Sequence, residues 1–449
     1  MSQAQGVKYL ALLDCLRDDI STGVLSAGQK LPPVRELAWS LEITPGTVAR
    51  AYQKGIDEGL LTANVGRGTF VAERNTGRTA AIKDDIHPVN LRSTRTPDVG
   101  QDKAIQQALT KMSKRSVVHY NQYPGVDDYT ELKQALRDWL LISNVRVDPG
   151  SIILSYGAQN GLMMAMATCL QGKKPVVLCE ELFYHGLRWA AETLRVELVP
   201  IEMDDEGFLP AALEQACQSS GATVLVTCSN VHNPTTVQTS QRRRLEIAAI
   251  AKRYDMQIID DDCWNNEPTE ADSYSVLCKE RYWLVSSLTK AVSAGLRFGF
   301  VVCPPGYTRQ TMRTMQSMFQ GLSQPVAEIA LELLTSGQAA KTRVQALQVI
   351  NDRVQRAANI LGHCNIRLRE NVPFVWLELP KGWRASRFAL HCERNDIIVR
   401  PSDEFTLPGG RTRNGIRVSL NANIPVDVLE NALRKISDLL SNPPLDDPT

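Results

Sequence analysis

Hydrophobic positions recur at helical spacing in the first seventy residues and in short strand-like runs over most of the remaining chain. A first helix, ending near Gly23, is predicted by apolar residues on one face: Tyr9, Leu10, Leu13, Leu16 and Ile20. A second helix is expected over residues 34–41, and a third begins after Thr44, a suitable N-cap. Strands are expected at residues 60–63 and 69–72, joined by a glycine-containing turn.

These elements predict a winged helix-turn-helix domain over residues 1–73. Residues 74–89 are polar, with few apolar positions, and are expected to form a linker. The body, residues 90–449, contains apolar runs at 152–154, 176–179, 224–227, 257–259, 283–285 and 298–302. Helical stretches separate most of these runs, which predicts an α/β fold with a mostly parallel central sheet covered on both faces. Further runs at 374–379, 397–400 and 416–420 predict a small α+β lobe.

Charge and composition exclude several classes of protein. Among 449 residues, 50 basic and 49 acidic side chains give a net charge of +1, which excludes a chain that is basic throughout. No apolar run approaches the roughly 20 residues of a membrane-spanning helix, and the N-terminus does not resemble a signal peptide. We therefore expect a cytoplasmic protein. The ten cysteines form no CxxC pair, so we expect reduced thiols and no metal site.

The third helix and the wing have the chemistry of a DNA-binding surface. Short polar side chains, Thr44 and Thr47, stand where a recognition helix meets base edges. Cations that can hold phosphates are available at Arg35, Arg50 and Arg67. Residues 1–75 contain eight basic and eight acidic side chains, so charge alone does not separate DNA binding from a small helical domain with ordinary surface arginines.

Several motifs in this region carry a family resemblance. LPxxRELA, TxxTVxRAY, EGL and GRGTFV occur in order between residues 31 and 71, and the segment resembles the N-terminal domain of the GntR superfamily of bacterial regulators. The resemblance implies that Arg35, Thr47, Arg50 and Arg67 contact DNA. Pro45 stands where the family often has a cation, which implies an unusual operator preference.

Four segments of the body place reactive groups directly after predicted strands. Lys290 follows one strand and can form a Schiff base with an aldehyde cofactor, and Arg297, seven residues later, can clamp a phosphate. In isolation, the segment would favour a surface lysine in a loop over a cofactor lysine. Asn233, after another strand, can donate to a ring hydroxyl. Gly157 precedes a helix expected to begin near Asn160, whose terminal amides suit a phosphate.

The fourth segment contains the acidic run Asp260–Asp262, followed by Cys263. An acid at a strand end can keep a pyridinium nitrogen protonated, and the alternative of a metal site lacks an accompanying histidine or further ligand cluster. Ligands of open α/β sheets bind outside the carboxyl ends of the strands. The four segments are therefore expected to meet at one site.

Over roughly residues 90–440 the combination resembles the fold-type I pyridoxal-phosphate aminotransferases. The resemblance implies that Lys290 binds the cofactor aldehyde, Asp261 the pyridine nitrogen and Asn233 the O3′ oxygen. The phosphate contacts that it implies are Ala158, Gln159, Ser287 and Arg297.

Three further roles are implied by the same resemblance. Tyr184 matches the aromatic residue that stacks on the ring, Tyr120 a tyrosine that reaches the partner subunit's phosphate, and Arg417 the arginine that grips an α-carboxylate. Core aromatic residues and a strand-exposed cation are the structural alternatives. Cys263 departs from the tyrosine that also holds O3′ in similar proteins, and a thiol is a weaker donor.

A GntR-type head joined to an aminotransferase-like body is the layout of MocR-type regulators. The resemblance implies a homodimer, possibly in a head-to-tail arrangement, that binds operator DNA and senses pyridoxal 5′-phosphate, a small amino compound, or both. Two alternatives remain. The body can be a working aminotransferase with a regulatory DNA-binding appendage, or it can have lost the cofactor and serve only for dimerisation.

Overall fold

The computed structural model describes residues 2–22, 24–26, 28–57, 60–64, 68–72, 88–114, 118–123, 129–264, 269–411 and 413–442. The chain divides into two compact units, residues 1–84 and 85–449. The division falls inside the predicted linker, most of which lies outside the described residues. Of the helices within the described ranges, none has both the length and the apolar character that a membrane crossing requires.

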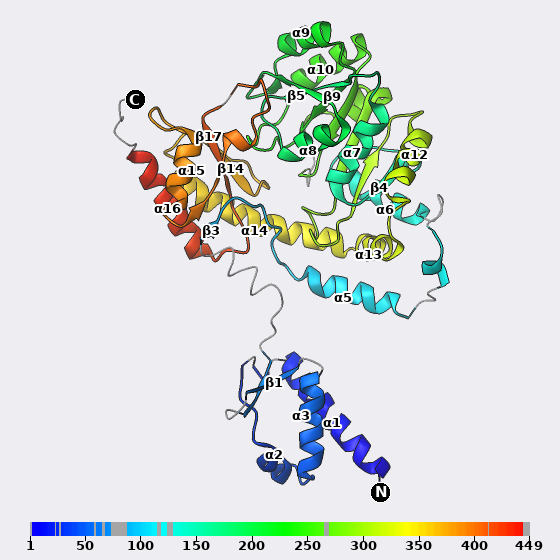
Figure 1. Cartoon of the computed structure of the whole chain (residues 1–449), viewed down its shortest axis with the longest axis vertical. Coiled ribbons are helices and arrows are strands. Elements are labelled where there is room, and N and C mark those ends of the chain that lie inside the picture. The colour runs from blue at the N-terminus through cyan, green and yellow to red at the C-terminus, as the bar shows by residue number, and fades with distance from the viewer. Residues whose placement is uncertain are drawn as a thin grey trace. The chain divides into compact units, whose positions relative to one another are not determined.

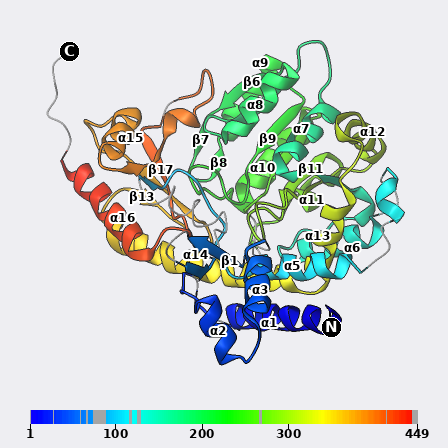
Figure 2. The same ribbon diagram turned by 60° about the horizontal axis from the view of Figure 1, so that its bottom comes forward.

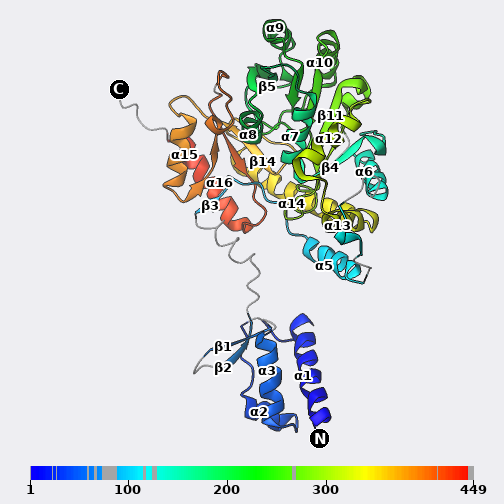
Figure 3. The same ribbon diagram turned by 45° about the vertical axis from the view of Figure 1, so that its right-hand side comes forward.

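The N-terminal unit is a small helical domain with a two-stranded wing (Figure 1). Its elements are α1 (Ser2–Thr22), α2 (Val34–Ser40), α3 (Pro45–Asp57), β1 (Leu61–Asn64) and β2 (Gly68–Val71). Figure 3 shows α3 between α1 and the β1–β2 pair. Buried residues from all five elements and the segment before α2 form its core, including Leu16, Leu31, Ala38, Val48, Leu61 and Val71. Thr44 accepts a hydrogen bond from the backbone N–H of Thr47 (3.3 Å), as predicted for an N-cap.

The larger unit is built around a seven-stranded sheet of order β4-β12-β11-β10-β9-β5-β6. Its strands are β4 (Ile152–Ser155), β5 (Val176–Glu180), β6 (Glu197–Ile201), β9 (Val224–Thr227), β10 (Gln257–Asp261), β11 (Tyr282–Ser287) and β12 (Gly299–Val302). Only β12 runs antiparallel to its neighbours among these pairs, so the prediction of a mostly parallel sheet is confirmed.

Alternate residues of the central strands enter two different cores, one on each face of the sheet. Leu225, Ile258 and Leu284 belong to one buried cluster. Their chain neighbours Val226 and Ile259 belong to the other. Both faces are therefore buried, which explains why these strands are continuous apolar runs with no polar alternation.

The helices of the large domain are α5 (Gln101–Met112), α6 (Thr130–Leu141), α7 (Gly157–Cys169), α8 (His185–Leu194), α9 (Pro210–Ser220), α10 (Gln241–Arg253), α11 (Tyr274–Leu277), α12 (Thr308–Phe319) and α13 (Gln324–Thr335). Helix α7 packs on β10, β11 and β12. The long helix α14 (Gln338–Leu361) runs from α13 to a smaller lobe (Figure 2).

The smaller lobe is an antiparallel sheet of order β13-β14-β17-β16, flanked by α15 (Ala385–Glu393) and α16 (Val426–Ser441). Its strands are β13 (Ile366–Arg367), β14 (Phe374–Glu378), β16 (Arg400–Pro401) and β17 (Gly415–Ser419). The predicted strand at 397–400 is divided in two, because β15 (Ile397–Ile398) pairs instead with β3 (Val89–Asn90). The α+β lobe itself is as predicted.

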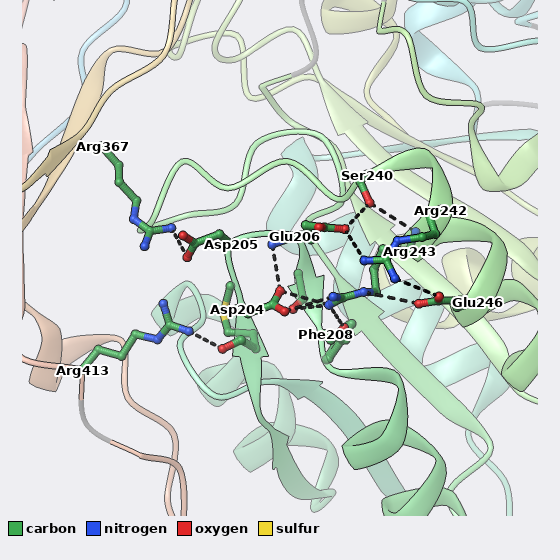
Figure 4. A network of polar contacts seen from close by, with 12 residues as sticks. Asp204, Asp205, Glu206, Phe208, Ser240, Arg242, Arg243, Glu246, Arg367 and Arg413 are labelled. Carbon is green, nitrogen blue, oxygen red and sulfur yellow. Dashed lines mark hydrogen bonds and ion pairs between the residues drawn. The ribbon is translucent and has the colours of Figure 1, made fainter.

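Ionic contacts join this lobe to the hairpin formed by β7 (Met203–Asp204) and β8 (Gly207–Phe208), as Figure 4 shows. Arg367 of the lobe pairs with Asp205 at 2.5 Å, and Arg413 donates to the carbonyl of Met203. On the other side, Arg243 of α10 binds both carboxylate oxygens of Asp204 at 3.0 Å. The hairpin is thus held from the lobe and from α10.

One buried arginine of α10 holds the loop that follows β9. Arg244 is 1% exposed and donates to the carbonyl of Ser229 (3.1 Å), the carbonyl of Thr239 (3.0 Å) and the side-chain oxygen of Asn230 (2.6 Å). Asp260 of β10 accepts from the backbone N–H of Ser229 at 2.9 Å. The loop that carries Asn233 is therefore fixed from both sides.

We expect Arg244→Met to destabilise the body by about 3 kcal/mol, because buried acceptors lose a charged donor. Urea unfolding of the purified protein measures the change. Arg253→Met on the same helix is the control, since Arg253 forms an exposed ion pair with Glu214 and its loss should cost less than about 1 kcal/mol. Equal stability of Arg244→Met and the control would show that Arg244 does not hold the loop.

Candidate functional site

A cavity of about 270 Å³ lies where the carboxyl ends of the central strands meet the smaller lobe. Ten of the eleven residues predicted for the body line it: Lys290, Asp261, Asn233, Arg297, Ser287, Ala158, Gln159, Tyr184, Cys263 and Arg417. They come from segments spread over 260 positions of the chain and converge at one place, as the strand-end argument predicts.

Lys290 lies just beyond β11, and burial makes its neutral form more accessible than in an exposed lysine. Its Nζ donates to the hydroxyl of Thr94 at 3.1 Å and lies 4.7 Å from the ring centre of Trp264. Burial lowers the pKa of Lys290 to about 8. About a tenth of this amine is therefore unprotonated at pH 7, far more than for an exposed lysine, and the unprotonated form is the one that attacks an aldehyde.

The lowered pKa of Lys290 makes the stability of the cofactor-free protein depend on pH. The pKa of Lys290 is near 10.5 in an unfolded chain and about 8 in the fold. Its burial therefore costs no folding free energy above about pH 10.5, and this part of the stability is lost as the pH falls through about 8. Lys290→Met removes the charge whose burial reduces the stability at lower pH. We expect it to stabilise cofactor-free protein by up to about 3 kcal/mol at pH 7, and by less than about 1 kcal/mol at pH 10. Urea unfolding at both pH values measures this, and a pH-independent difference would contradict it.

Asp261 ends β10 and is paired with a thiol. The Sγ of Cys263 donates to Oδ1 of Asp261 at 3.0 Å. Burial raises the pKa of Asp261 to about 6, while the bond from Cys263 opposes this rise. Asp261 is thus mostly ionised at neutral pH and can pair with a protonated ring nitrogen. Cys263 also stands where similar proteins have a tyrosine at O3′, and its place near O3′ stays a prediction.

A phosphate-sized anion has donors at the start of α7. The helix begins at Gly157, three residues before the expected start at Asn160, so Ala158 and Gln159 lie in its first turn. The side chain of the N-cap residue Tyr156 makes no cap hydrogen bond, and Asn160 accepts from the N–H of Tyr156 itself, which leaves the first amides of α7 for a ligand. A Cβ at position 157 would lie 2.9 Å from Nη2 of Arg297. Glycine therefore lets the guanidinium approach the helix end closely.

Arg417 of β17 orients the asparagine of the site. It is 4% exposed, and it donates to the amide oxygen of Asn233 at 2.7 Å and to the carbonyl of Arg92 at 2.8 Å. This leaves the amide NH2 of Asn233 as the group that can donate to a ligand hydroxyl. Burial, together with the charge of Arg400, lowers the pKa of Arg417 to about 9.

Tyr120 is the predicted body residue that does not line the cavity. It is 38% exposed, and its hydroxyl donates to Glu328 at 3.2 Å. Its expected place at the partner subunit's phosphate stays a prediction, because it concerns a second chain.

In the N-terminal unit, Arg35, Thr44 and Arg50 are exposed, as DNA contact requires. Thr47 is 6% exposed and shares a 2.9 Å hydrogen bond with the Thr44 hydroxyl, so its side chain does not stand free at the start of α3 as expected. Arg67 lies outside the described residues.

Several cavity residues were not predicted from the sequence: Arg92, Ser93, Thr94, His185, Cys228, Trp264, Thr289 and Arg400. Trp264 and His185 adjoin the predicted Cys263 and Tyr184, so widening each motif by one residue would have found both. Thr94 and Arg400 follow no recognisable motif. They reach the cavity through tertiary contacts far along the chain.

The donor set fits pyridoxal phosphate. An aldehyde needs a neutral buried lysine, a pyridinium nitrogen needs an ionised carboxylate, and a phosphate needs helix amides and a cation. Lys290, Asp261 and the α7–Arg297 pair supply these groups within one cavity, and the missing side chain of Gly157 keeps the anion site open.

Comparisons with known proteins agree with both units. Residues 87–436 match the model of the family "Aminotransferase class I and II", and residues 8–71 match "Bacterial regulatory proteins, gntR family". The HTH-type transcriptional regulator YdeF of Bacillus subtilis is 25% identical over 450 residues, covering 98% of this chain and 96% of that protein. The vitamin B6 salvage pathway transcriptional repressor PtsJ of Salmonella typhimurium is 23% identical over 417 residues, covering 91% and 93%.

Among solved structures, an archaeal alanine:glyoxylate aminotransferase superposes with a TM-score of 0.71 at 21% identity, covering 82% of this chain and 94% of that one. At this identity the likeness establishes the fold of the larger unit.

Proposed function

The chain belongs to the aminotransferase class I and II family, and with its gntR-family domain it has the domain composition of a MocR-type regulator. On that premise we propose that it is a transcriptional regulator whose body binds pyridoxal phosphate. The observation that carries the proposal is the cavity, in which the lysine, the acid, the asparagine and the phosphate-binding helix end meet. The N-terminal unit binds operator DNA, and a chromosomal operator places the protein in the cytoplasm.

The cavity residues have separable tasks. Pyridoxal phosphate, when bound, supplies an aldehyde for amines and an electron-withdrawing ring. Lys290 provides the amine that holds it, Asp261 keeps its ring nitrogen protonated, and Arg297 with the α7 amides neutralises its phosphate. Arg417 is available for the carboxylate of an amino compound, which makes the same cavity an effector site. The name of PtsJ, which refers to vitamin B6 salvage, supports a B6-derived ligand.

An absorbance spectrum with and without borohydride, followed by peptide mapping, tests cofactor binding. We expect the purified protein to absorb in the visible range and the reduced cofactor to map to the peptide that contains Lys290. A colourless protein that takes up no added cofactor would favour the dimerisation-only alternative.

A working aminotransferase is the second candidate, because Lys290, Asp261, Asn233 and Arg297 all line the cavity. Incubation with amino donors and an assay for keto acid separates the two functions. A sensor binds the amine without releasing keto acid over many turnovers, whereas an enzyme accumulates it.

We also infer a homodimer. Tyr120 is exposed and lies outside the cavity that the other predicted residues of the body line, and the resemblance to fold-type I aminotransferases implies that it contacts the phosphate of a second copy of the chain. Light scattering coupled to gel filtration should give a mass near twice the chain mass of 49.8 kDa. Two heads per dimer would then read two half-sites of an operator.

A further inference from the structure

Two arginines face each other on neighbouring strands of the small lobe, and both line the cavity. Arg400 on β16 is the register partner of Arg417 on the antiparallel strand β17. Side chains directly opposite in such a pair share one face of the sheet, with Cβ atoms about 5 Å apart. Both guanidinium groups also lie near the Phe405 ring, at 5.9 and 5.2 Å from its centre. Like charges so placed repel each other, and an anion between them would relieve the repulsion.

The protein itself provides little to neutralise Arg400. Its Nε lies 3.5 Å from Glu404, but Arg92 already donates to both oxygens of that carboxylate at 2.8 Å. Its Nη1 lies 2.9 Å from Nδ1 of His185. Burial, followed by the nearby arginine charges, lowers the pKa of His185 to about 4, so this ring is neutral and adds no negative charge.

Both arginines keep donors for a ligand. Within the described part of the chain, the buried Nε of Arg417 has no hydrogen-bond partner, and the buried Nε of Arg400 has no hydrogen bond beyond its long ion pair of 3.5 Å with Glu404. Such atoms are costly when unsatisfied, because a buried charged donor loses its water without replacement.

The charged residues that line the cavity also indicate that it binds more than one anionic group. Its cations are Lys290, Arg92, Arg297, Arg400 and Arg417, and its one acid in the described residues is Asp261. A cofactor phosphate would neutralise Arg297, and the α-carboxylate of an amino acid would neutralise Arg417. Of the described acids, Arg400 would then have only Glu404, a carboxylate outside the cavity lining that already accepts two hydrogen bonds from Arg92.

We propose that Arg400 binds a second acidic group, and that the effector is therefore a dicarboxylic amino acid. The inference rests on the proposed function, since it takes the cavity as the site for an amino compound. Arg400 is then the residue that determines specificity, because Arg417 alone would accept the α-carboxylate of any amino acid.

Calorimetric titration of the cofactor-loaded, full-length protein tests this with matched ligand pairs. L-glutamate is compared with L-glutamine, and L-aspartate with L-asparagine, since each pair has nearly the same shape and differs in one charge. Of L-glutamate and L-aspartate, we expect the one that binds more tightly to exceed the affinity of its own amide roughly 10- to 100-fold. This ratio corresponds to the free energy of a hydrogen bond to a charged group. Arg400→Gln should bring that ratio close to one while changing amide affinity by less than about threefold.

Arg387→Gln is the control, because Arg387 is an exposed arginine of α15 in the same lobe and should leave the ratio unchanged. Equal affinities for acid and amide in the wild-type protein would overturn the proposal, and this comparison decides even when Arg400→Gln does not fold. A preference that survives in folded Arg400→Gln would also overturn it.

The cofactor spectrum separates this inference from its premise. A normal spectrum with no preference for acids rejects the role of Arg400 alone. A protein that takes up no cofactor and binds none of the four amino acids rejects the proposed function as well.

Discussion

Replacing Lys290 with alanine is expected to abolish covalent retention of the cofactor. Lys290 Nζ is the amine placed in the cavity by Thr94 and Trp264, and its lowered pKa supplies the neutral form. After borohydride treatment and denaturation, wild-type protein should retain one cofactor per chain and Lys290→Ala none. Helix α7 and Arg297 remain in the variant, so weaker, reversible binding through the phosphate should persist.

Lys381→Ala, an exposed lysine of the small lobe, is the matched control and should be labelled like the wild-type protein. Dialysis should remove the absorbance of Lys290→Ala and leave that of the control. Retention of label by Lys290→Ala, mapped to another lysine, would mean that the cavity has been assigned the wrong nucleophile.

Replacing Arg50 with alanine is expected to weaken operator binding by about 1–3 kcal/mol, which is roughly 5- to 150-fold. Arg50 is exposed on α3, and its guanidinium stacks 4.6 Å from the centre of the Tyr9 ring, so its position is fixed before DNA arrives. If Arg50 contacts a phosphate, the salt dependence of binding should also fall by about one unit of slope.

Fluorescence anisotropy with labelled operator measures both effects at a series of salt concentrations. Arg137→Ala is the control and should bind as wild type, because Arg137 is a half-exposed arginine of α6 in the body. Because Arg50 is remote in sequence from the cofactor site, the absorbance spectrum of Arg50→Ala should be unchanged. Unaltered operator affinity in Arg50→Ala would show that the recognition surface lies elsewhere on the N-terminal unit.

Much of the fold could be predicted because its strands are buried on both faces. Val224–Thr227 and Tyr282–Ser287 are continuous apolar or small-residue runs, and polar groups follow where the strands end at the site. The edge strand Glu197–Ile201 was missed, since only its last residue is fully buried and its apolar signal is weak.

The rest of the site depends on contacts between segments far apart in the sequence. Thr94 meets Lys290 across 196 positions, and Arg400 faces Arg417 through strand register. No periodicity in the sequence encodes either contact. The position of the Thr47 side chain could not be predicted either, although its partner is close in the sequence. Its hydroxyl is buried against Thr44 in the cap of α3, and a sequence motif does not specify this side-chain geometry.

Cys263 illustrates how a substitution within a motif can change partners. A shorter side chain at this position donates to Asp261, two residues earlier, which helps to keep that carboxylate ionised. Its effect is therefore expected on Asp261, the acid that we propose for the ring nitrogen, whereas the amide of Asn233 is the proposed donor toward O3′.

We propose that cofactor binding in the body alters DNA binding by the N-terminal unit. The most direct test of this proposal is the operator affinity of cofactor-free and cofactor-loaded protein at one fixed salt concentration, since salt alone changes such affinities strongly. A regulator of this kind is expected to show a difference of about 5- to 150-fold, and Lys290→Ala should show a smaller one. Equal affinities of the two forms, with and without dicarboxylic amino acids present, would contradict the account.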